Sequence, residues 1–215
     1  MTVINTGDIT IPLEDVELKG ILSIPEAAKG IVIFSHGSGS SRFSTRNQKV
    51  AGYLRQRKLG TLLLDLLTEE EDEVYSNRFN ITLLTKRLAG VTEWLSRLPA
   101  SKNCLIGYFG ASTGAASALN AAAILPQVAA VVSRGGRPDL AMNNLQLVKA
   151  PTLLIVGSLD YDVMLLNEKA LQEIQGVKKM VIIDGAGHLF EEPGKMDEVS
   201  ALAGKWFETY LGGSL

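Results

Sequence analysis

The chain has 215 residues, of which 46% are hydrophobic and 20% are charged, and its net charge is −2. This length supports one well-formed core, and the lack of a basic excess argues against a nucleic-acid binder. No apolar run approaches the ~18 residues that span a bilayer, and the opening MTVINTGDITIP lacks the pattern of a signal peptide. We therefore expect a single domain over residues 1–215, located in the cytoplasm, with no membrane and no nucleic-acid partner.

Short apolar runs alternate with helical segments along the chain. Strands are predicted at 8–12, 16–25, 30–35, 60–67, 104–109, 128–133, 151–157 and 178–184. Helices are predicted at 46–58, 80–98, 113–125, 140–145, 167–176 and 196–211. The acidic run EEEDE at 69–73 is interpreted as a solvated loop. This order predicts an α/β fold, with a mostly parallel sheet of about eight strands, helices on both faces and an antiparallel edge at the start.

The segment CLIGYFGASTGAASALNAAA at 104–123 carries the main functional signal. Its GASTG fits the G-x-S-x-G turn, in which a serine lies between a strand and a helix. Gly110 and Gly114 would leave room for the tight turn, and Ser112 would lie at a helix N-terminus that stabilises negative charge. Close packing alone, or a phosphate loop, could also explain these small residues. A phosphate loop is disfavoured because no lysine follows Gly114 and GSGSSR at 37–42 lacks the third glycine of a dinucleotide-binding loop.

A serine nucleophile needs a neighbouring base, and the base needs an acid to orient it. His188 follows the last predicted strand, and Asp160 follows the strand PTLLIVG, with Asp162 as the alternative acid. The chain order Ser112, Asp160, His188 is the nucleophile, acid, base order of the α/β-hydrolases. The other histidine, His36, precedes the nucleophile, where this order places no base. We interpret it as a residue that positions its own loop.

An oxyanion hole needs two amide donors, one from the residue after the nucleophile and one from the loop after the third strand. These rules predict the amides of Thr113 and Ser38, with Gly39 as the alternative to Ser38. Two arginines near the same end of the sheet, Arg134 and Arg42, are candidates to bind a carboxylate or phosphate of the substrate.

Other polar residues near these strand ends have simpler interpretations. Arg134 and its neighbour Arg137 could instead form salt bridges to an acid such as Asp139. Asp65 is out of order as the acid of a triad, so we expect a structural hydrogen bond there. Most of the early basic residues, Arg46 among them, are interpreted as solvated helix charges.

The chain offers no recognisable metal-ligand cluster, since it has two separated histidines and one cysteine. We expect neither a metal nor a cofactor. The cysteine, Cys104, lies inside a predicted strand and is interpreted as a buried small hydrophobe. The segment between Ser133 and Pro151 has room for a small helix at most. We therefore expect a minimal lid or none, and an open site suited to small or exposed esters.

The segments FSHGSGSS, GYFGASTG, LLIVGSLD and GAGHLFEEPG together make the chain resemble an α/β-hydrolase of the dienelactone hydrolase family. The resemblance covers nearly the whole chain and implies Ser112 as nucleophile, Asp160 as acid and His188 as base. Dienelactone hydrolases proper are similar but carry cysteine at the elbow, so the dienelactone substrate is not implied. Close relatives also resemble the hydrolase part of proteins fused to a phosphoribosyltransferase domain, and we expect no such domain in this chain.

These observations predict a serine hydrolase that cleaves a small carboxylic ester or lactone through an acyl-enzyme. Two alternatives stay open. One is a non-catalytic binding protein on the same scaffold, and the other is an acyltransferase or peptidase that uses the same triad. The expected partner is a small-molecule ester or lactone, and a homodimer is one candidate assembly.

Overall fold

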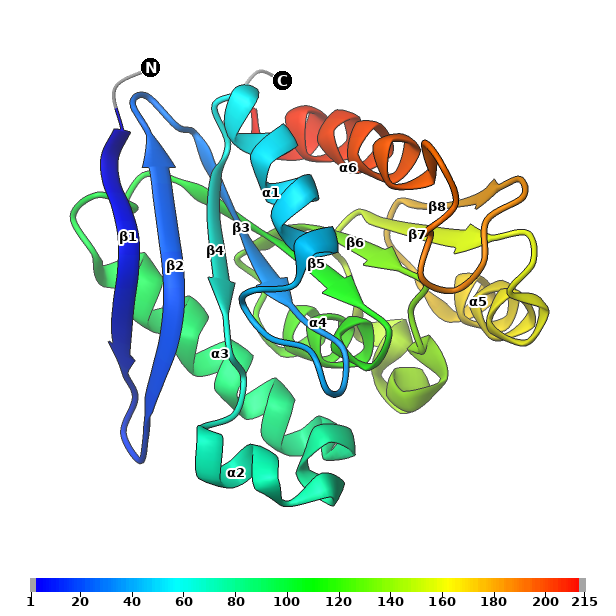
Figure 1. Ribbon diagram of the computed structural model, residues 1–215, viewed down its shortest axis with the longest axis horizontal. Helices are drawn as coiled ribbons and strands as arrows, with labels where there is room; N and C mark the ends of the chain where they lie inside the picture. Colours follow the sequence, from blue (N-terminus) through cyan, green and yellow to red (C-terminus); the bar gives the residue numbers. More distant parts are fainter. Residues whose placement is uncertain (1–2, 213–215) are drawn as a thin grey trace.

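An eight-stranded sheet runs through the protein in this computed structural model, which describes residues 3–212 (Figure 1). Its strands are β1 (Val3–Pro12), β2 (Glu17–Pro25), β3 (Gly30–Ser35), β4 (Gly60–Leu64), β5 (Leu105–Ala111), β6 (Val128–Arg134), β7 (Thr152–Gly157) and β8 (Lys178–Ile183). They lie in the order β1-β2-β4-β3-β5-β6-β7-β8. β1 pairs antiparallel with β2 and β2 pairs antiparallel with β4, whereas the remaining neighbours are parallel.

The strand sequences explain this arrangement. Every residue is buried in β3 (GIVIFS), β4 (GTLLL) and β7 (TLLIVG), as expected for strands that are covered on both faces. The first half of β2 instead alternates between exposed and buried residues, which fits a strand near the edge of the sheet. The mostly parallel sheet with an antiparallel start, predicted from the sequence, is confirmed.

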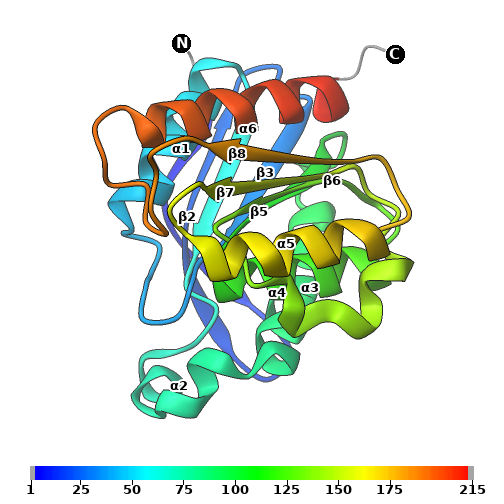
Figure 2. The same ribbon diagram turned by 90° about the vertical axis from the view of Figure 1, so that its right-hand side faces the viewer.

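Helices cover both faces of the sheet. They are α1 (Thr45–Gln56), α2 (Glu69–Glu73), α3 (Ile81–Arg97), α4 (Thr113–Ile124), α5 (Tyr161–Glu173) and α6 (Lys195–Leu211), with the 3₁₀ helices η1 (Tyr75–Phe79) and η2 (Pro138–Leu147). Figure 2 shows α1 and α6 on one face and α3, α4 and α5 on the other. The core therefore has two layers, one that contains Phe34, Phe109 and Phe207 and one that contains Leu88 and Tyr108. None of the helices within residues 3–212 has both the length and the apolar composition needed to cross a bilayer.

Several elements differ from the sequence prediction, since β1 begins at Val3 and not at residue 8, η1 was not predicted, and three other helices differ as well. The acidic run 69–73 forms helix α2 and not a loop, because Thr68 and Glu71 make a reciprocal cap. The Thr68 hydroxyl accepts from the Glu71 amide at 3.1 Å, and the Glu71 carboxylate accepts from the Thr68 amide at 3.0 Å. Helix α5 begins at Tyr161, earlier than the predicted start at residue 167. The predicted helix at 140–145 is the longer 3₁₀ helix η2, which opens on a proline.

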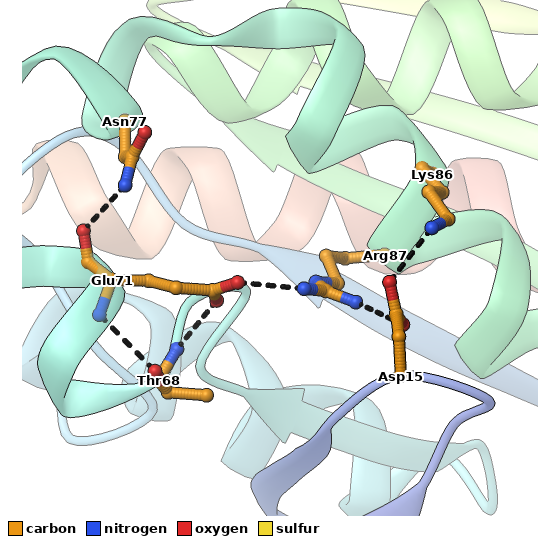
Figure 3. Close-up of polar contacts among 6 residues, drawn as sticks. All are labelled: Asp15, Thr68, Glu71, Asn77, Lys86 and Arg87. Atoms are coloured by element: carbon orange, nitrogen blue, oxygen red, sulfur yellow. Dashed lines mark hydrogen bonds and ion pairs between the residues drawn. The ribbon is translucent and has the colours of Figure 1, made fainter.

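Polar contacts hold α2 in place, since none of its residues is buried (Figure 3). Arg87 of α3 is 4% exposed and donates to Glu71 of α2 and to Asp15 of the β1–β2 turn, at 2.6 Å in both cases. Lys86 donates to the second carboxylate oxygen of Asp15 at 2.8 Å. Asn77 of η1 donates to the backbone carbonyl of Glu71 at 2.8 Å. Glu71 thus joins α2 and η1 to helix α3.

We expect Glu71→Ala to lower the free energy of unfolding by about 1–3 kcal/mol, because it leaves a donor of the buried Arg87 guanidinium unpaired. Urea unfolding of the two proteins measures the difference. Glu73→Ala is the matched control, since Glu73 lies on the same helix but is exposed, and its effect should stay within about 0.5 kcal/mol. Equal effects of the two substitutions would contradict a structural role for the Arg87–Glu71 pair.

Candidate active site

Ser112 lies in a strained turn between strand β5 and helix α4. Its φ is +50° and its ψ is −121°, so a residue that is not glycine adopts a left-handed φ. The neighbouring glycines explain the turn. A Cβ at Gly110 would lie 2.5 Å from the Cα of Ala115, and a Cβ at Gly114 would overlap the carbonyl of Ser35. The helix therefore approaches the sheet closely, and the serine side chain is held at the strand end.

The structure brings Ser112, His188 and Asp160 together from three separate loops. The Nε2 atom of His188 lies 3.3 Å from the Ser112 hydroxyl oxygen, and its Nδ1 atom lies 2.6 Å from a carboxylate oxygen of Asp160. Asp160 follows β7 as the N-cap of α5, and His188 lies in the loop between β8 and α6. Asp162, the alternative acid, is exposed in the first turn of α5. This geometry fits a nucleophile, a base and an orienting acid.

The loop after β3 lies directly against this serine. A Cβ at Gly37 would be 3.2 Å from the Cβ of Ser112, a tighter contact than most Cβ atoms make, so glycine favours this approach. The amide of Ser38 donates to the hydroxyl oxygen of Thr113 at 2.9 Å. Gly39 continues the turn with a φ of +67°. Ser38 and Thr113, the two predicted oxyanion donors, are thus neighbours across the loop and the start of α4.

His36 connects the same loop to the end of β4. Its Nε2 atom accepts from the amide of Leu66 at 3.2 Å, so the ring proton must be on Nδ1 when the ring is neutral. Nδ1 then donates to the carbonyl of Gly37 at 2.9 Å. Burial lowers the pKa of His36, which favours the neutral ring that this pair of bonds requires. The geometry agrees with the interpretation of His36 as a residue that positions its loop.

Arg134 is a buried cation at the end of β6, and its backbone carbonyl accepts from the Ser112 amide at 3.2 Å. The side chain is 4% exposed, and its Nε has no hydrogen-bond partner. No carboxylate in residues 3–212 forms an ion pair with it, and its guanidinium lies 5.8 Å from the centroid of the Phe190 ring. Burial, and to a lesser degree the charge of Arg46, lowers the pKa of Arg134 to about 10.

The candidate Arg42 and the neighbouring Arg137 are both paired with acids. Arg137 forms two hydrogen bonds of 2.8 Å to the carboxylate of Asp139, which is the salt bridge that the sequence suggested as an alternative. Arg42 pairs with Asp65, which accepts from both the backbone amide of Arg42, at 2.6 Å, and its guanidinium. Of the three side chains, Arg134 is the one that forms no ion pair with an acid among residues 3–212.

Sequence patterns gave no signal for two features of this site. Phe190, two residues after His188, is 1% exposed. Its φ is +56°, a left-handed value that is rare for a bulky aromatic residue. Arg46, interpreted as a solvated charge, lies close enough to Arg134 to affect its pKa, and it pairs with Glu191 at 2.8 Å. Both contacts join the His188 loop to distant segments, so local spacing could not predict them.

The part of the chain that the structure describes forms neither a metal site nor a reactive thiol near Ser112. Among residues 3–212, no three histidine, cysteine, aspartate or glutamate side chains lie close enough to hold a metal ion. Cys104 lies just before β5 and is half-buried, so the prediction of a buried cysteine inside a strand is wrong. Its thiol donates to the carbonyl of Ala28 at 3.2 Å and packs against the core. Burial raises the pKa of its thiol, as expected for a cysteine with a packing role.

The fold is that of the α/β-hydrolases. The chain is similar over 96% of its length to the crystal structure of a dienelactone hydrolase from Anabaena variabilis, with 53% identity and a TM-score of 0.94 over 98% of that chain. Est1E from Butyrivibrio proteoclasticus shares the fold at 15% identity, with a TM-score of 0.82 over 95% of this chain and 99% of that one. The model of the dienelactone hydrolase family matches residues 18–210, and the chain therefore belongs to this family of hydrolases.

A curated relative has a different name. A protein of Mycobacterium tuberculosis, provisionally named a phosphoribosyl transferase, is 50% identical over 207 residues. The match covers 96% of this chain and 47% of the relative. The chain thus spans about half the length of the curated relatives that it matches.

Because His36 is buried and neutral, the free energy of unfolding should depend on pH in a defined way. Because its folded-state pKa is lowered, the unfolded chain binds a proton below about pH 6.5 that the folded chain does not. The stability that neutral His36 contributes is therefore fully present above that pH and is lost as the pH falls below it. His36→Asn keeps a donor near the carbonyl of Gly37 but does not titrate.

The free energy of unfolding should thus fall less for His36→Asn than for the wild type between about pH 7.5 and about pH 5.5. Urea unfolding at both pH values gives the two differences. All other titrating groups are common to the two proteins, so the comparison isolates His36. The same loss of stability in both proteins would show that His36 takes up a proton as readily in the folded state as in the unfolded state.

Proposed function

We propose that this chain is a serine hydrolase that cleaves a small carboxylic ester or lactone through an acyl-enzyme. The observation that carries the proposal is the hydrogen-bonded line from Ser112 through His188 to Asp160. A serine is a weak nucleophile until a base removes its proton, and a base works best when an acid fixes its tautomer. Membership of a hydrolase family and the likeness to a dienelactone hydrolase support the same reaction class.

In the first half of the proposed reaction, His188 Nε2 takes the hydroxyl proton of Ser112 while the serine oxygen attacks the substrate carbonyl carbon. Asp160 accepts from Nδ1–H and stabilises the imidazolium that forms. The carbonyl π electrons move to the oxygen, which becomes the oxyanion of a tetrahedral intermediate. The Thr113 amide, at the first position of helix α4, is free to donate to this oxygen, and Ser38 lies beside it.

Collapse of this intermediate completes the acylation. The oxyanion re-forms the carbonyl, the bond to the alcohol oxygen breaks, and His188 donates its proton to that oxygen. Water then attacks the acyl-serine, with His188 as the base that accepts its proton. The second tetrahedral intermediate breaks its bond to the serine oxygen, His188 returns the proton to that oxygen, and the carboxylic acid leaves. In a lactone the alcohol and the acid remain parts of one product molecule.

The connection between β6 and β7 supports a small or exposed substrate. It contains the single 3₁₀ helix η2, which packs beside α4 and α5 and adds no further element. Acyl transfer and peptide cleavage share the first half-reaction and remain the alternative activities of the same residues. The phosphoribosyl transferase name applies to a relative about twice as long, and an activity of that whole protein does not follow for a chain that matches half of it.

Arg134 favours a substrate that carries an anionic group. A buried cation without a counter-ion is unfavourable for folding, so the feature is best explained by a ligand that supplies the negative charge. Its backbone carbonyl is bonded to the Ser112 amide, which places the residue next to the nucleophile. A guanidinium presents paired donors that match a carboxylate or a phosphate. Arg42, already paired with Asp65, is the weaker of the two candidates.

Treatment with a fluorophosphonate probe tests the nucleophile. We expect a single covalent adduct on the wild type, seen as an increase in intact mass, and no adduct on Ser112→Ala. Hydrolysis of p-nitrophenyl acetate should fall by at least about 10³-fold in the same variant. A folded wild type that forms no adduct and hydrolyses no ester or lactone would leave the non-catalytic binding protein as the better explanation.

Arg134→Met tests the proposal of an anionic substrate, because it should raise the stability of the protein and lower its preference for an anionic ester. The free energy of unfolding should rise by about 1–3 kcal/mol, because the variant no longer buries an unpaired charge. The ratio of kcat/KM for p-nitrophenyl hemisuccinate to that for p-nitrophenyl butyrate should fall by about tenfold or more, since a charge-assisted bond is lost. Chemical unfolding and steady-state kinetics measure the two effects.

Arg137→Met is the matched control, because Arg137 is an ion-paired arginine three residues away. It should leave the substrate ratio unchanged and should not raise the stability. If Arg134→Met raises the stability but keeps the substrate ratio of the wild type, Arg134 is not a substrate contact.

A further inference from the structure

The hydroxyl group of Thr113 has an unusual set of hydrogen-bond partners. Thr113 is 4% exposed and directly follows the strained Ser112. Its oxygen accepts from the Ser38 amide at 2.9 Å, and this is the only hydrogen bond that its side chain makes among residues 3–212. A hydroxyl has one donor hydrogen besides its acceptor positions. The hydroxyl hydrogen of Thr113 is therefore available for a further bond.

Two threonines in the interior of other helices donate their hydroxyl hydrogen within their own helix. Thr92 donates to the carbonyl of Leu88 at 2.8 Å, and Thr209 donates to the carbonyl of Lys205 at 2.9 Å. These bonds need a carbonyl four residues earlier in the same helix. Thr113 is the first residue of α4, so the residue four positions before it belongs to strand β5. The usual acceptor is absent, and the side chain reaches across to the oxyanion loop instead.

This bond changes how the oxyanion hole can work. The Ser38 amide has one hydrogen, and that hydrogen is already directed at the Thr113 oxygen. It cannot make a full second bond to a substrate oxyanion while this contact persists. The Thr113 hydroxyl, by contrast, accepts on one side and has a hydrogen to give on the other. A donor that accepts from a second donor is polarised by it and binds an anion more strongly.

We propose that the Thr113 hydroxyl donates directly to the oxyanion, and that the Ser38 amide acts through it. The proposal rests on the proposed function, because it needs an oxyanion formed at Ser112. It makes the Thr113 side chain a catalytic group in addition to the Thr113 amide, and it makes Ser38 a positioning residue. No proton is transferred in this step: the hydroxyl keeps its hydrogen and shares it with the negative oxygen.

The test compares Thr113→Val with Thr113→Ser. Valine has nearly the shape of threonine and the same β-branching but no hydroxyl, whereas serine keeps the hydroxyl. For p-nitrophenyl acetate we expect Thr113→Val to lower kcat by about 10²-fold with little change in KM, because the bond forms only in the transition state. Thr113→Ser should recover most of this loss. Thermal unfolding of each variant shows that the protein is folded.

Thr209→Val is the matched control, since it removes a helical hydroxyl that bonds within its own helix. It should leave kcat unchanged. A direct Ser38 amide donor predicts the opposite result for Thr113→Val, because the substitution frees that amide for the substrate. A kcat equal to or above that of the wild type would therefore overturn the proposal.

The rate of fluorophosphonate labelling separates this outcome from failure of the proposed function. If the wild type is labelled at Ser112 and hydrolyses ester, and Thr113→Val does both equally fast, the serine hydrolase stands and the hydroxyl role is wrong. If the folded wild type is neither labelled nor active, no oxyanion forms, and both proposals are overturned. Slower labelling of Thr113→Val, together with its lower kcat and recovery by serine, would support the hydroxyl role.

Discussion

The close approach of helix α4 to strands β3 and β5 is the constraint on which the rest of the site depends. A side chain at Gly114 would overlap the backbone of β3, and one at Gly110 would overlap the start of α4. The buried hydroxyls of Ser35 in β3 and Ser117 in α4 are hydrogen-bonded at 2.8 Å and join the helix to that strand. With the helix this close, the chain must reverse within one residue. Ser112 therefore takes a left-handed φ, and its side chain is held at the carboxyl edge of the sheet.

The parallel register then brings distant residues to that edge. Ser35 pairs with Gly110, and Ala111 pairs with Arg134, so the loops after β3, β5 and β6 begin at nearly the same level. The turns after β7 and β8 bring Asp160 and His188 to the same edge. Since parallel strands all end on one side, the sheet alone is sufficient to collect residues that are far apart in sequence.

The parts that the sequence predicted are those that obey local rules. Continuous apolar runs identified the buried strands, and the spacing of GASTG identified the elbow whose geometry Ser112 adopts. The acidic run 69–73 was misjudged from its charge alone, although Thr68 and Glu71 already have the T-x-x-E spacing of a capping box. By contrast, nothing in the sequence tells that Arg87 lies beside Glu71, or whether an acid lies near the guanidinium of Arg134. Those contacts depend on tertiary packing, and the hydrophobic periodicity of the sequence does not show which distant side chains meet.

Backbone strain by itself does not mark the site. Ala27 and Lys58 also have left-handed φ values, but both are exposed, as turn residues often are. What sets the edge around Ser112 apart is that backbone strain and unpaired polar groups occur together. Among the described residues 3–212, Arg134 has no counter-ion and the hydroxyl hydrogen of Thr113 has no acceptor. Each feature is unfavourable for folding alone, by about 1–3 kcal/mol. Two well-packed apolar layers can tolerate such features at one edge, and a substrate with a negative oxygen and an anionic group would satisfy both polar groups.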